Sequence, residues 1–379
     1  MKILAIETSC DETGIAVLEF APLGTEPNLN KPKILFSVLS SQVDIHAKTA
    51  GIVPEIASRI HSEILPHFLI QVDQKIGLGN VDYIATTSSP GLLGSLLVGN
   101  NFSRMLSFLY NKPILAVDHI MGHFYSSFVK LPLNKIEFPA LGLIVSGGHT
   151  ALILATAKNK FKIIGGTRDD AAGEAFDKVA RLLNLSYPGG PAISQAAAKI
   201  KNSPFKFTTP MLKSNDFDFS FSGLKTQVRQ TVEKITSNCH PEQSEEAQPA
   251  SSYKMDKKIR PVKSSLPEES MRLSNMVKSQ IAFAAQTAIV DSLVKKSFSA
   301  TTKYHPKTFI LGGGVAANQL LREKLITELS VIMPKNKIFI PELKYATDNA
   351  AMIAIASYMG LPKNITAWDK LETSSSSNL

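Results

Sequence analysis

The chain has 379 residues, 44% of them apolar, so it is long enough for two domains with sizeable cores. Lysine and arginine number 41 against 32 acidic residues, and the resulting charge of +9 favours a polyanionic partner, although a generally basic proteome would give the same value. Two cysteines are too few for a disulfide framework, which indicates a reducing compartment. The sequence has no signal peptide and no run of 18 apolar residues, so we expect a soluble, cytoplasmic protein without a membrane span.

The first third of the chain alternates strand-like and helix-like segments. Strands are expected at 2–8, 14–20, 33–42, 81–87 and 113–117. Helices are expected from Pro54 to about Lys75, from residue 92 to about Tyr110, and over 118–129. The polar residues at 9–13 predict a hairpin turn between the first two strands.

The pattern restarts after Pro139. Strands are expected on either side of a small-residue turn within 141–157, then at 161–167, 309–314 and 337–341, with helices from about Ala171 and over 316–329 and 348–360. Alternation of strands and helices predicts largely parallel sheets with covered faces. Because a hairpin, a third strand and a helix occur twice in the same order, we expect two lobes of like topology, although common hairpins could produce this order by chance.

These patterns suggest a domain division. We place an N-terminal lobe at 1–136, joined by a helix at 353–370 that returns to it, and a C-terminal lobe at 137–352. Residues 237–274 are rich in Ser, Pro, Glu and Lys and are expected to be a disordered insertion or surface loop. Residues 371–379 are expected to form a disordered tail.

Three turns built from small residues follow hydrophobic strands, at 8–14, 146–150 and 312–318. Such turns allow backbone N–H groups to approach an anionic or nucleotide ligand, although each one alone could simply close a tight hairpin. None matches the P-loop or the dinucleotide-binding fingerprint, which argues against those two enzyme classes. Three turns in one chain favour a nucleotide cleft between the lobes.

His119 and His123 are four residues apart in an expected helix, a spacing that places both rings on one face and suits chelation. A chance pair is the main alternative. The sequence between them lacks the glutamate of a zinc protease, and Asp118 is a candidate helix cap. Asp348 is either another cap or an oxygen ligand that joins the histidines. Two imidazoles and one carboxylate leave coordination positions open for substrate, as in catalytic sites.

Several other polar or aromatic segments have two interpretations. Acidic residues at junctions between loops and helices, namely Asp11, Glu12, Asp169, Asp170, Glu174 and Asp177, are either caps or functional groups. The aromatic stretch at 217–228 could stack a base, but its alternation favours a buried strand edge.

Eight ordered motifs together resemble one family. They are IETSCDETGIAV at 6–17, GIVPEIASR at 51–59, LIVSGGHTALI at 143–153, DDAAGEAFDKVARLL at 169–183, YPGGPAIS at 187–194, DFSFSGLKT at 218–226, LGGGVAAN at 311–318 and ATDNAAMIA at 346–354. The set resembles the tRNA N6-adenosine threonylcarbamoyltransferases, the TsaD family, over nearly the whole chain except the segment at 237–274 and the tail.

The resemblance implies an α/β fold of the actin/Hsp70/sugar-kinase type, with duplicated mixed sheets flanked by helices around a central cleft. It implies transfer of threonylcarbamoyl from threonylcarbamoyl-AMP to the N6 amine of adenosine 37, in tRNAs that read codons starting with A, with release of AMP. It also implies one divalent metal ion, Fe²⁺ in first place and Zn²⁺ as the alternative, since the ligand set suits both. Expected partners are tRNA, a shorter inactive paralogue and a small P-loop ATPase.

The resemblance also implies roles for individual residues. The metal ligands would be His119, His123 and Asp348, and the catalytic carboxylates near the reacting carbonyl would be Asp11 and Glu12. Substrate would be bound by Ile144, Val145, Ser146, Gly147, Gly148, Asp177, Gly190 and Asn318. The chain departs from the family pattern at Met121, where a glutamate is usual, and at Ser89, where a glycine is usual.

Other activities remain as alternatives. The interpretation as a metalloprotease would depend on the two histidines alone. An ATPase or sugar kinase would share the fold without needing them, and a non-catalytic scaffold would have an eroded site.

Overall fold

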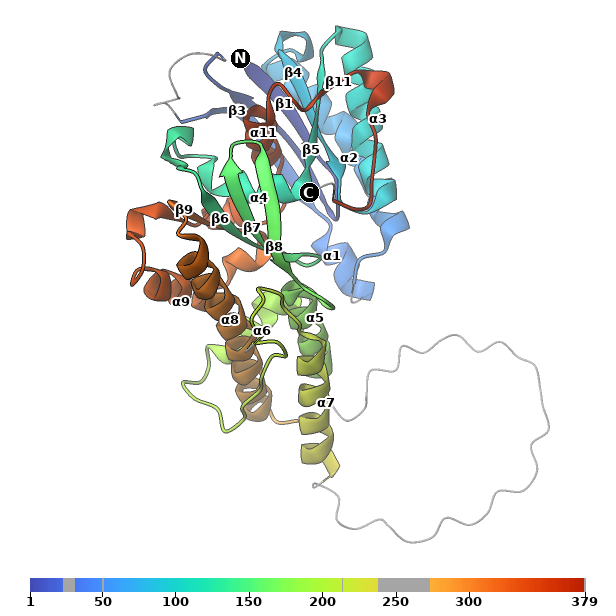
Figure 1. The fold of residues 1–379 in the computed structure, drawn as a ribbon. Helices are drawn as coiled ribbons and strands as arrows, with labels where there is room; N and C mark the ends of the chain where they lie inside the picture. Colours follow the sequence, from blue (N-terminus) through green and yellow to red (C-terminus); the bar gives the residue numbers. More distant parts are fainter. Residues whose placement is uncertain (23–30, 50, 213, 238–272, 378–379) are drawn as a thin grey trace, which may run out of the picture.

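The computed structural model describes residues 1–22, 31–49, 51–212, 214–237 and 273–377. These residues form two mixed β-sheets with helices on both faces of each (Figure 1). The expected fold class is therefore confirmed.

The first sheet has six strands in the order β11-β5-β4-β1-β2-β3. The strands are β1 (Lys2–Glu7), β2 (Glu12–Glu19), β3 (Lys33–Ser41), β4 (Tyr83–Ser89), β5 (Ile114–Asp118) and β11 (Ile365–Thr366). β1, β2 and β3 pair antiparallel, whereas β4 and β5 continue the sheet in parallel. After β3 the chain forms the helices α1 (Val43–His46) and α2 (Pro54–Lys75), and α3 (Leu93–Tyr110) follows β4.

The faces of this sheet follow the alternation of side chains along β1. Leu4 and Ile6 pack in a core with α2 and α3, whereas Ile3 and Ala5 face the opposite side. Successive side chains of a strand point to opposite faces, so a strand with apolar residues at every position must be covered on both sides.

The second sheet repeats this arrangement, with the order β10-β9-β6-β7-β8. Its strands are β6 (Ala140–Val145), β7 (Thr150–Ala157), β8 (Lys160–Gly166), β9 (Thr308–Gly312) and β10 (Ile338–Phe339). Again three antiparallel strands are followed by two parallel ones. The duplication expected from the order of elements is thus present in the pairing of the strands.

Among the residues that the structure describes, five helices cover the outer side of the second sheet: α5 (Ala172–Leu182), α6 (Gly189–Ala197), α7 (Ser222–Ser237), α8 (Asn275–Tyr304) and α9 (Gln319–Leu329). They share one core with Leu141, Leu143 and Val145 of β6. Ile144 points the other way.

Two helices lie between the sheets, α4 (His119–Tyr125) and α11 (Ala350–Gly360), and the short helix α10 (Leu343–Ala346) precedes α11 (Figure 1). Their buried side chains form one core with residues of both sheets, including Ile3 and Ile144. The two helices pack closely at Gly122, where a Cβ atom would lie 2.8 Å from the Ile353 side chain. This central pair positions the candidate site, because α4 begins directly after β5 and α11 begins near Asp348.

The structure differs from the sequence-based expectations in two places. The returning helix expected at 353–370 ends at Gly360, and the chain then forms β11 beside β5. The expected disordered tail is instead bound along residues 371–377: Leu371 is buried, and the backbone N–H of Ser374 donates to Ser88. The expected insertion at 237–274 lies almost entirely outside the described residues, and the lobe boundary at residue 136 stays a prediction.

Among the described residues, none of the helices has both the length and the apolar character needed to cross a membrane.

Candidate functional site

A cavity of about 410 Å³ is lined by residues from both halves of the molecule. The part that carries the first sheet contributes Ser9, Cys10, Asp11, Glu12, Ile52, Pro90, Gly91, Leu92 and His119. The remainder of the lining is Ser146, Gly147, Gly148, His149, Tyr187, Gly314, Thr347, Asp348 and Ser375. All three small-residue turns identified in the sequence therefore reach one cavity.

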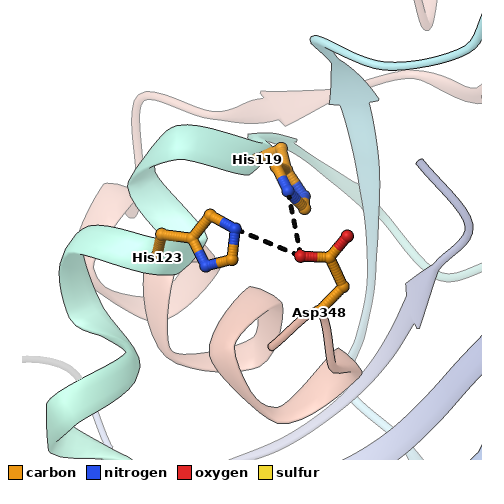
Figure 2. A group of neighbouring side chains, drawn as sticks. All are labelled: His119, His123 and Asp348. Atoms are coloured by element: carbon orange, nitrogen blue, oxygen red, sulfur yellow. Dashed lines mark ion pairs between the residues drawn. The ribbon is translucent and has the colours of Figure 1, made fainter. Parts of the chain in front are cut away.

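The side chains of His119, His123 and Asp348 point toward one another, as Figure 2 shows. Of the three, His119 and Asp348 line the cavity. One carboxylate oxygen of Asp348 lies 3.4 Å from Nε2 of His119 and 3.1 Å from Nε2 of His123. The three candidate ligand atoms lie within 4.8 Å of one another. The four-residue spacing on α4 places both rings on the same side of the helix, as predicted.

The residues present fit a divalent cation. Neither ring nitrogen of His123 makes a well-aligned hydrogen bond among the described residues, although the side chain is fully buried and Nε2 lies 3.1 Å from the Asp348 carboxylate. A buried polar atom without a partner is costly, and a cation held by the Nε2 atoms and the carboxylate would give Nε2 of His123 a partner. Imidazole and carboxylate are ligands that iron and zinc accept equally.

The N-caps of α4 and α11 explain why the Asp348 carboxylate can face the two imidazoles. Asp118 caps α4, because its carboxylate accepts a hydrogen bond from the N–H of Ile120 at 2.8 Å, as predicted. Asp348 does not cap α11. That position belongs to Asn349, whose side chain accepts from the N–H of Met352 at 3.0 Å. The Asp348 carboxylate is therefore left to face the imidazoles.

Burial and charge shift the titration of the ligand set. Burial alone would lower the pKa of His119, but Asp348 and Glu7 raise it well above its usual range. Burial alone would raise the pKa of Asp348, but the two histidines hold it well below its usual range. Burial and the neighbouring His119 lower the pKa of His123. In the metal-free site His119 therefore keeps its proton beside the ionised carboxylate of Asp348.

Two further groups in the cavity are shifted toward their neutral forms. Burial, with Asp348 and Asp11 nearby, raises the pKa of Glu12 to about 10. Burial, together with His119 and His123, lowers the pKa of His149 to about 4. In the metal-free protein at neutral pH, Glu12 is a carboxylic acid and His149 an uncharged imidazole.

The loop that carries Asp11 and Glu12 is fixed by backbone contacts. The N–H of Gln42 donates to the carbonyl of Asp11 at 3.0 Å, and the N–H of Leu92 donates to the carbonyl of Ser9 at 2.8 Å. Gly91 makes this approach possible, because a Cβ atom there would lie 2.6 Å from the Ser9 carbonyl oxygen. Both predicted catalytic carboxylates therefore stand on a rigid edge of the cavity.

The turn after β6 leaves its backbone open to the cavity. Gly147 and Gly148 are exposed, and a Cβ atom on either would contact nothing within 4 Å. Ser146 and His149 close the turn, with the N–H of Ser146 donating to the carbonyl of His149 at 2.8 Å. Open N–H groups at such a turn are suited to phosphate or carbonyl oxygens.

The structure does not bring every predicted substrate residue to this cavity. Ile144 and Val145 have buried side chains that face the two cores on either side of β6. Asp177 lines a neighbouring cavity of about 210 Å³, which shares Tyr187 with the first, and it accepts a hydrogen bond from the N–H of Gly189. Gly190 lies near the start of α6, where a Cβ atom would contact nothing.

Asn318 is engaged in a polar network behind the cavity. Its side-chain oxygen caps α9 by accepting from the N–H of Leu321, and its amide donates to Ser194 and Gln286 at 3.1 and 2.9 Å. The substrate roles of Asp177, Gly190 and Asn318 stay predictions.

The aromatic stretch belongs to the core, as favoured from its alternation. Phe217, Phe219 and Phe221 are buried among the helices of the second sheet. The N–H of Phe219 donates to the carbonyl of Gly166, which extends the edge of that sheet.

Sequence reasoning overlooked one buried carboxylate beside the site. Glu7, at the end of β1, is fully buried and lies 3.2 Å from Nδ1 of His119. The signal that could have revealed it is an acidic residue at the end of an otherwise apolar, buried strand. His149 was also not predicted as a functional group in its own right, although it lies within the predicted turn at 146–150.

Comparison with known proteins supplies the family. Residues 33–355 match the family model described as TsaD, tRNA N6-adenosine threonylcarbamoyltransferase. A protein of that name from Thermosipho africanus is 40% identical over 376 residues, covering 98% of each chain. One from Kosmotoga olearia is 42% identical, covering 94% of this chain and 93% of its own.

Solved structures support the fold. A HypF from T. kodakarensis superposes with a TM-score of 0.55 at 12% identity, covering 98% of this chain and 49% of that one. Full-length HypF in a phosphate- and nucleotide-bound form gives a TM-score of 0.52 at 12% identity, covering 99% and 56%. At this identity the likeness concerns the fold alone.

Proposed function

Because the chain belongs to the tRNA N6-adenosine threonylcarbamoyltransferase family, we propose that it transfers threonylcarbamoyl from threonylcarbamoyl-AMP to the N6 amine of adenosine 37 in tRNAs that read codons starting with A. In this reaction the amine forms a bond to the carbamoyl carbon, the bond from that carbon to the phosphate oxygen breaks, the amine loses a proton, and AMP departs.

The observation that carries this proposal is the convergence of three kinds of group on one cavity. Open backbone at Gly147 and Gly148, the carboxyl groups of Asp11 and Glu12, and the cluster of His119, His123 and Asp348 all line it or lie at its wall. An acylated nucleotide needs anion-binding N–H groups, a proton acceptor and charge stabilisation, and each has a candidate here.

Asp11 is the better candidate for the group that takes the amine proton. Glu12 also faces the cavity, but its pKa of about 10 keeps it protonated at neutral pH in the metal-free protein. A general base must be deprotonated before it can accept a proton.

His119, His123 and Asp348 would hold the divalent ion, with iron as first choice and zinc as the alternative. When bound, the ion supplies positive charge that polarises substrate oxygens and stabilises the leaving phosphate. The protein's own turns and carboxylates hold and orient the substrate around it.

A peptidase is not favoured by these residues. A zinc peptidase of the H-E-x-x-H type has a glutamate as base directly after its first histidine ligand. In this chain Ile120 follows His119, and both Ile120 and Met121 are buried in the core between the sheets.

The proposal is tested by incubating the protein with threonylcarbamoyl-AMP, a divalent metal and an unmodified tRNA, and analysing the nucleosides by mass spectrometry. We expect threonylcarbamoyladenosine with the wild type and none with the double variant His119→Ala/His123→Ala. His67→Ala, an exposed histidine on α2, serves as matched control. Unchanged product from the double variant would remove the site assignment. In a parallel assay with added ATP, steady ATP hydrolysis without tRNA product would favour a kinase-like activity.

The shorter paralogue and the small P-loop ATPase are proposed as further components of the reaction in the cytoplasm. If adding them to the same assay leaves the yield unchanged, that part of the proposal fails.

A further inference from the structure

Within the part of the chain that the structure describes, Glu7 is the one carboxylate outside the candidate ligand set that contacts one of its histidines. It is fully buried at the end of β1, and its Oε1 accepts a hydrogen bond from the N–H of Ser9 at 2.6 Å. Its Oε2 accepts from the hydroxyl of Thr87 at 2.5 Å and lies 3.2 Å from Nδ1 of His119. Burying a carboxylate is costly unless it is paired and hydrogen-bonded, and here each oxygen accepts at least one hydrogen bond.

These contacts decide which nitrogen of His119 faces the cavity as a ligand. An ionised carboxylate can only accept hydrogen bonds, so Nδ1 of His119 must carry the proton in this contact. The hydroxyl of Ser9, 3.1 Å from the same nitrogen, can accept from it as well. Nε2 is thereby left as the ring atom that faces Asp348, 3.4 Å away.

We propose that Glu7 is a positioning residue for the metal site, which holds the His119 ring in the tautomer and orientation that offer Nε2 to the ion. The inference rests on the metal site of the proposed function. A carboxylate bonded to the far nitrogen of a ligating imidazole fixes the ring and makes the ligand more basic, and loss of such a partner lowers metal affinity by about 10- to 100-fold.

The direct test is Glu7→Gln, measured as zinc affinity by competition with a chromophoric chelator. With the glutamine oxygen toward Ser9, its NH₂ group would face Nδ1 of His119, which must then give up its proton and become an acceptor. With the amide reversed, the NH₂ group would oppose the N–H of Ser9. Either orientation disturbs the site, so we expect zinc to bind about 10- to 100-fold more weakly.

Thr87→Val is the matched control. It removes one hydrogen bond to the same Oε2 but keeps the carboxylate opposite His119. We expect its zinc affinity to stay within about threefold of the wild type. This change is smaller than the loss of about 10- to 100-fold expected when the hydrogen-bond partner of a ligating histidine is removed. A folded Glu7→Gln variant with wild-type affinity overturns the inference.

A second measurement needs no variant. In the zinc-loaded wild type, long-range ¹H–¹⁵N spectra should show a proton on Nδ1 of His119 and none on Nε2, and the reverse pattern overturns the inference. The zinc affinity of His119→Ala/His123→Ala distinguishes an error in the metal site from an error in the role of Glu7. If that variant binds zinc as tightly as the wild type, the metal site itself is wrong; if it loses zinc while Glu7→Gln does not, only the role of Glu7 fails.

Discussion

Nε2 of His123 lies 3.1 Å from a carboxylate oxygen of Asp348, although the whole second sheet separates the two residues along the chain. The same oxygen is 3.4 Å from Nε2 of His119. The pairing exists because α4 and α11 pack against each other between the sheets.

This geometry predicts that metal binding releases a proton. The pKa of His119 is raised well above its usual range by Asp348 and Glu7, against the effect of burial, so the metal-free site holds a proton at neutral pH. A ligating imidazole nitrogen must be deprotonated, so zinc must displace that proton. Calorimetric titrations in two buffers of different ionisation enthalpy should therefore give different apparent heats, and affinity should weaken as the pH falls. Identical heats would contradict the prediction.

Glu12 should make the metal-free protein less stable as the pH rises. Its pKa is about 10 in the folded state against an ordinary value of 4.5, so the folded protein keeps a proton that the unfolded chain releases. The stabilisation is complete below pH 4.5 and is lost progressively as the pH rises toward 10. Glu12→Gln removes the titration, so its melting temperature should exceed that of the wild type at pH 9 by more than at pH 5. Glu63→Gln, at an exposed position on α2, is the control for the loss of a carboxylate outside the cavity.

Gly173→Ala should disturb the open turn after β6. A Cβ atom at this position would lie 2.5 Å from the Ser146 carbonyl oxygen and 2.8 Å from the Cα of Gly147, and backbone atoms cannot yield locally. We expect the Michaelis constant for threonylcarbamoyl-AMP to rise about tenfold or more, equivalent to at least about 1.4 kcal/mol. Gly166→Ala is the control, because its nearest neighbour would be 3.9 Å away. Unchanged kinetics in Gly173→Ala would show that the turn does not hold the substrate.

Phe219→Ala distinguishes a core residue from a base-stacking one. Phe219 is fully buried beside Phe221, so the substitution should reduce the free energy of unfolding by about 3–5 kcal/mol. Val331→Ala, at a side chain that is 77% exposed, should change it by about 0.5 kcal/mol or less. Denaturant unfolding measures both. A stable Phe219→Ala variant that has lost tRNA affinity would instead support stacking.

Affinity for tRNA should depend strongly on salt. The formal charge of +9 favours contacts with phosphate, and each contact releases counterions on binding. Anisotropy titrations with labelled tRNA should show at least about a tenfold loss of affinity between 50 and 200 mM salt. A flat response would assign the recognition to uncharged contacts.

The sequence predicted the fold well because its signals are local. Pro54 marks the first turn of α2, and the strand at 2–7 is apolar at nearly every position, as a strand covered on both faces must be. The repeated order of hairpin, strand and helix correctly predicted the duplicated sheets. The helix expected up to residue 370 was wrong beyond Gly360, where Pro362 follows and the chain turns toward β11.

The site was predicted less completely, since its contacts join distant parts of the chain. Spacing along one helix suggested His119 and His123, but whether Asp348 capped a helix or joined them depended on Asn349, which takes the cap. The sequence did not predict a role for Glu7, because only the packing of β1 beside α4 brings Glu7 to His119. The tail was expected to be disordered from its serines, yet those small polar residues find backbone and carboxylate partners.

The bound C-terminal segment has a practical consequence. The hydroxyl of Ser377 donates to the Asp118 carboxylate at 2.7 Å, and Ser375 lines the cavity. A label attached to the exposed Ser376 would therefore lie beside the candidate site. The amino group of Met1 instead bonds to Phe20, at the far end of β1 from that region. Of the two regions, the one at Ser376 suits a fluorescent reporter of tRNA arrival.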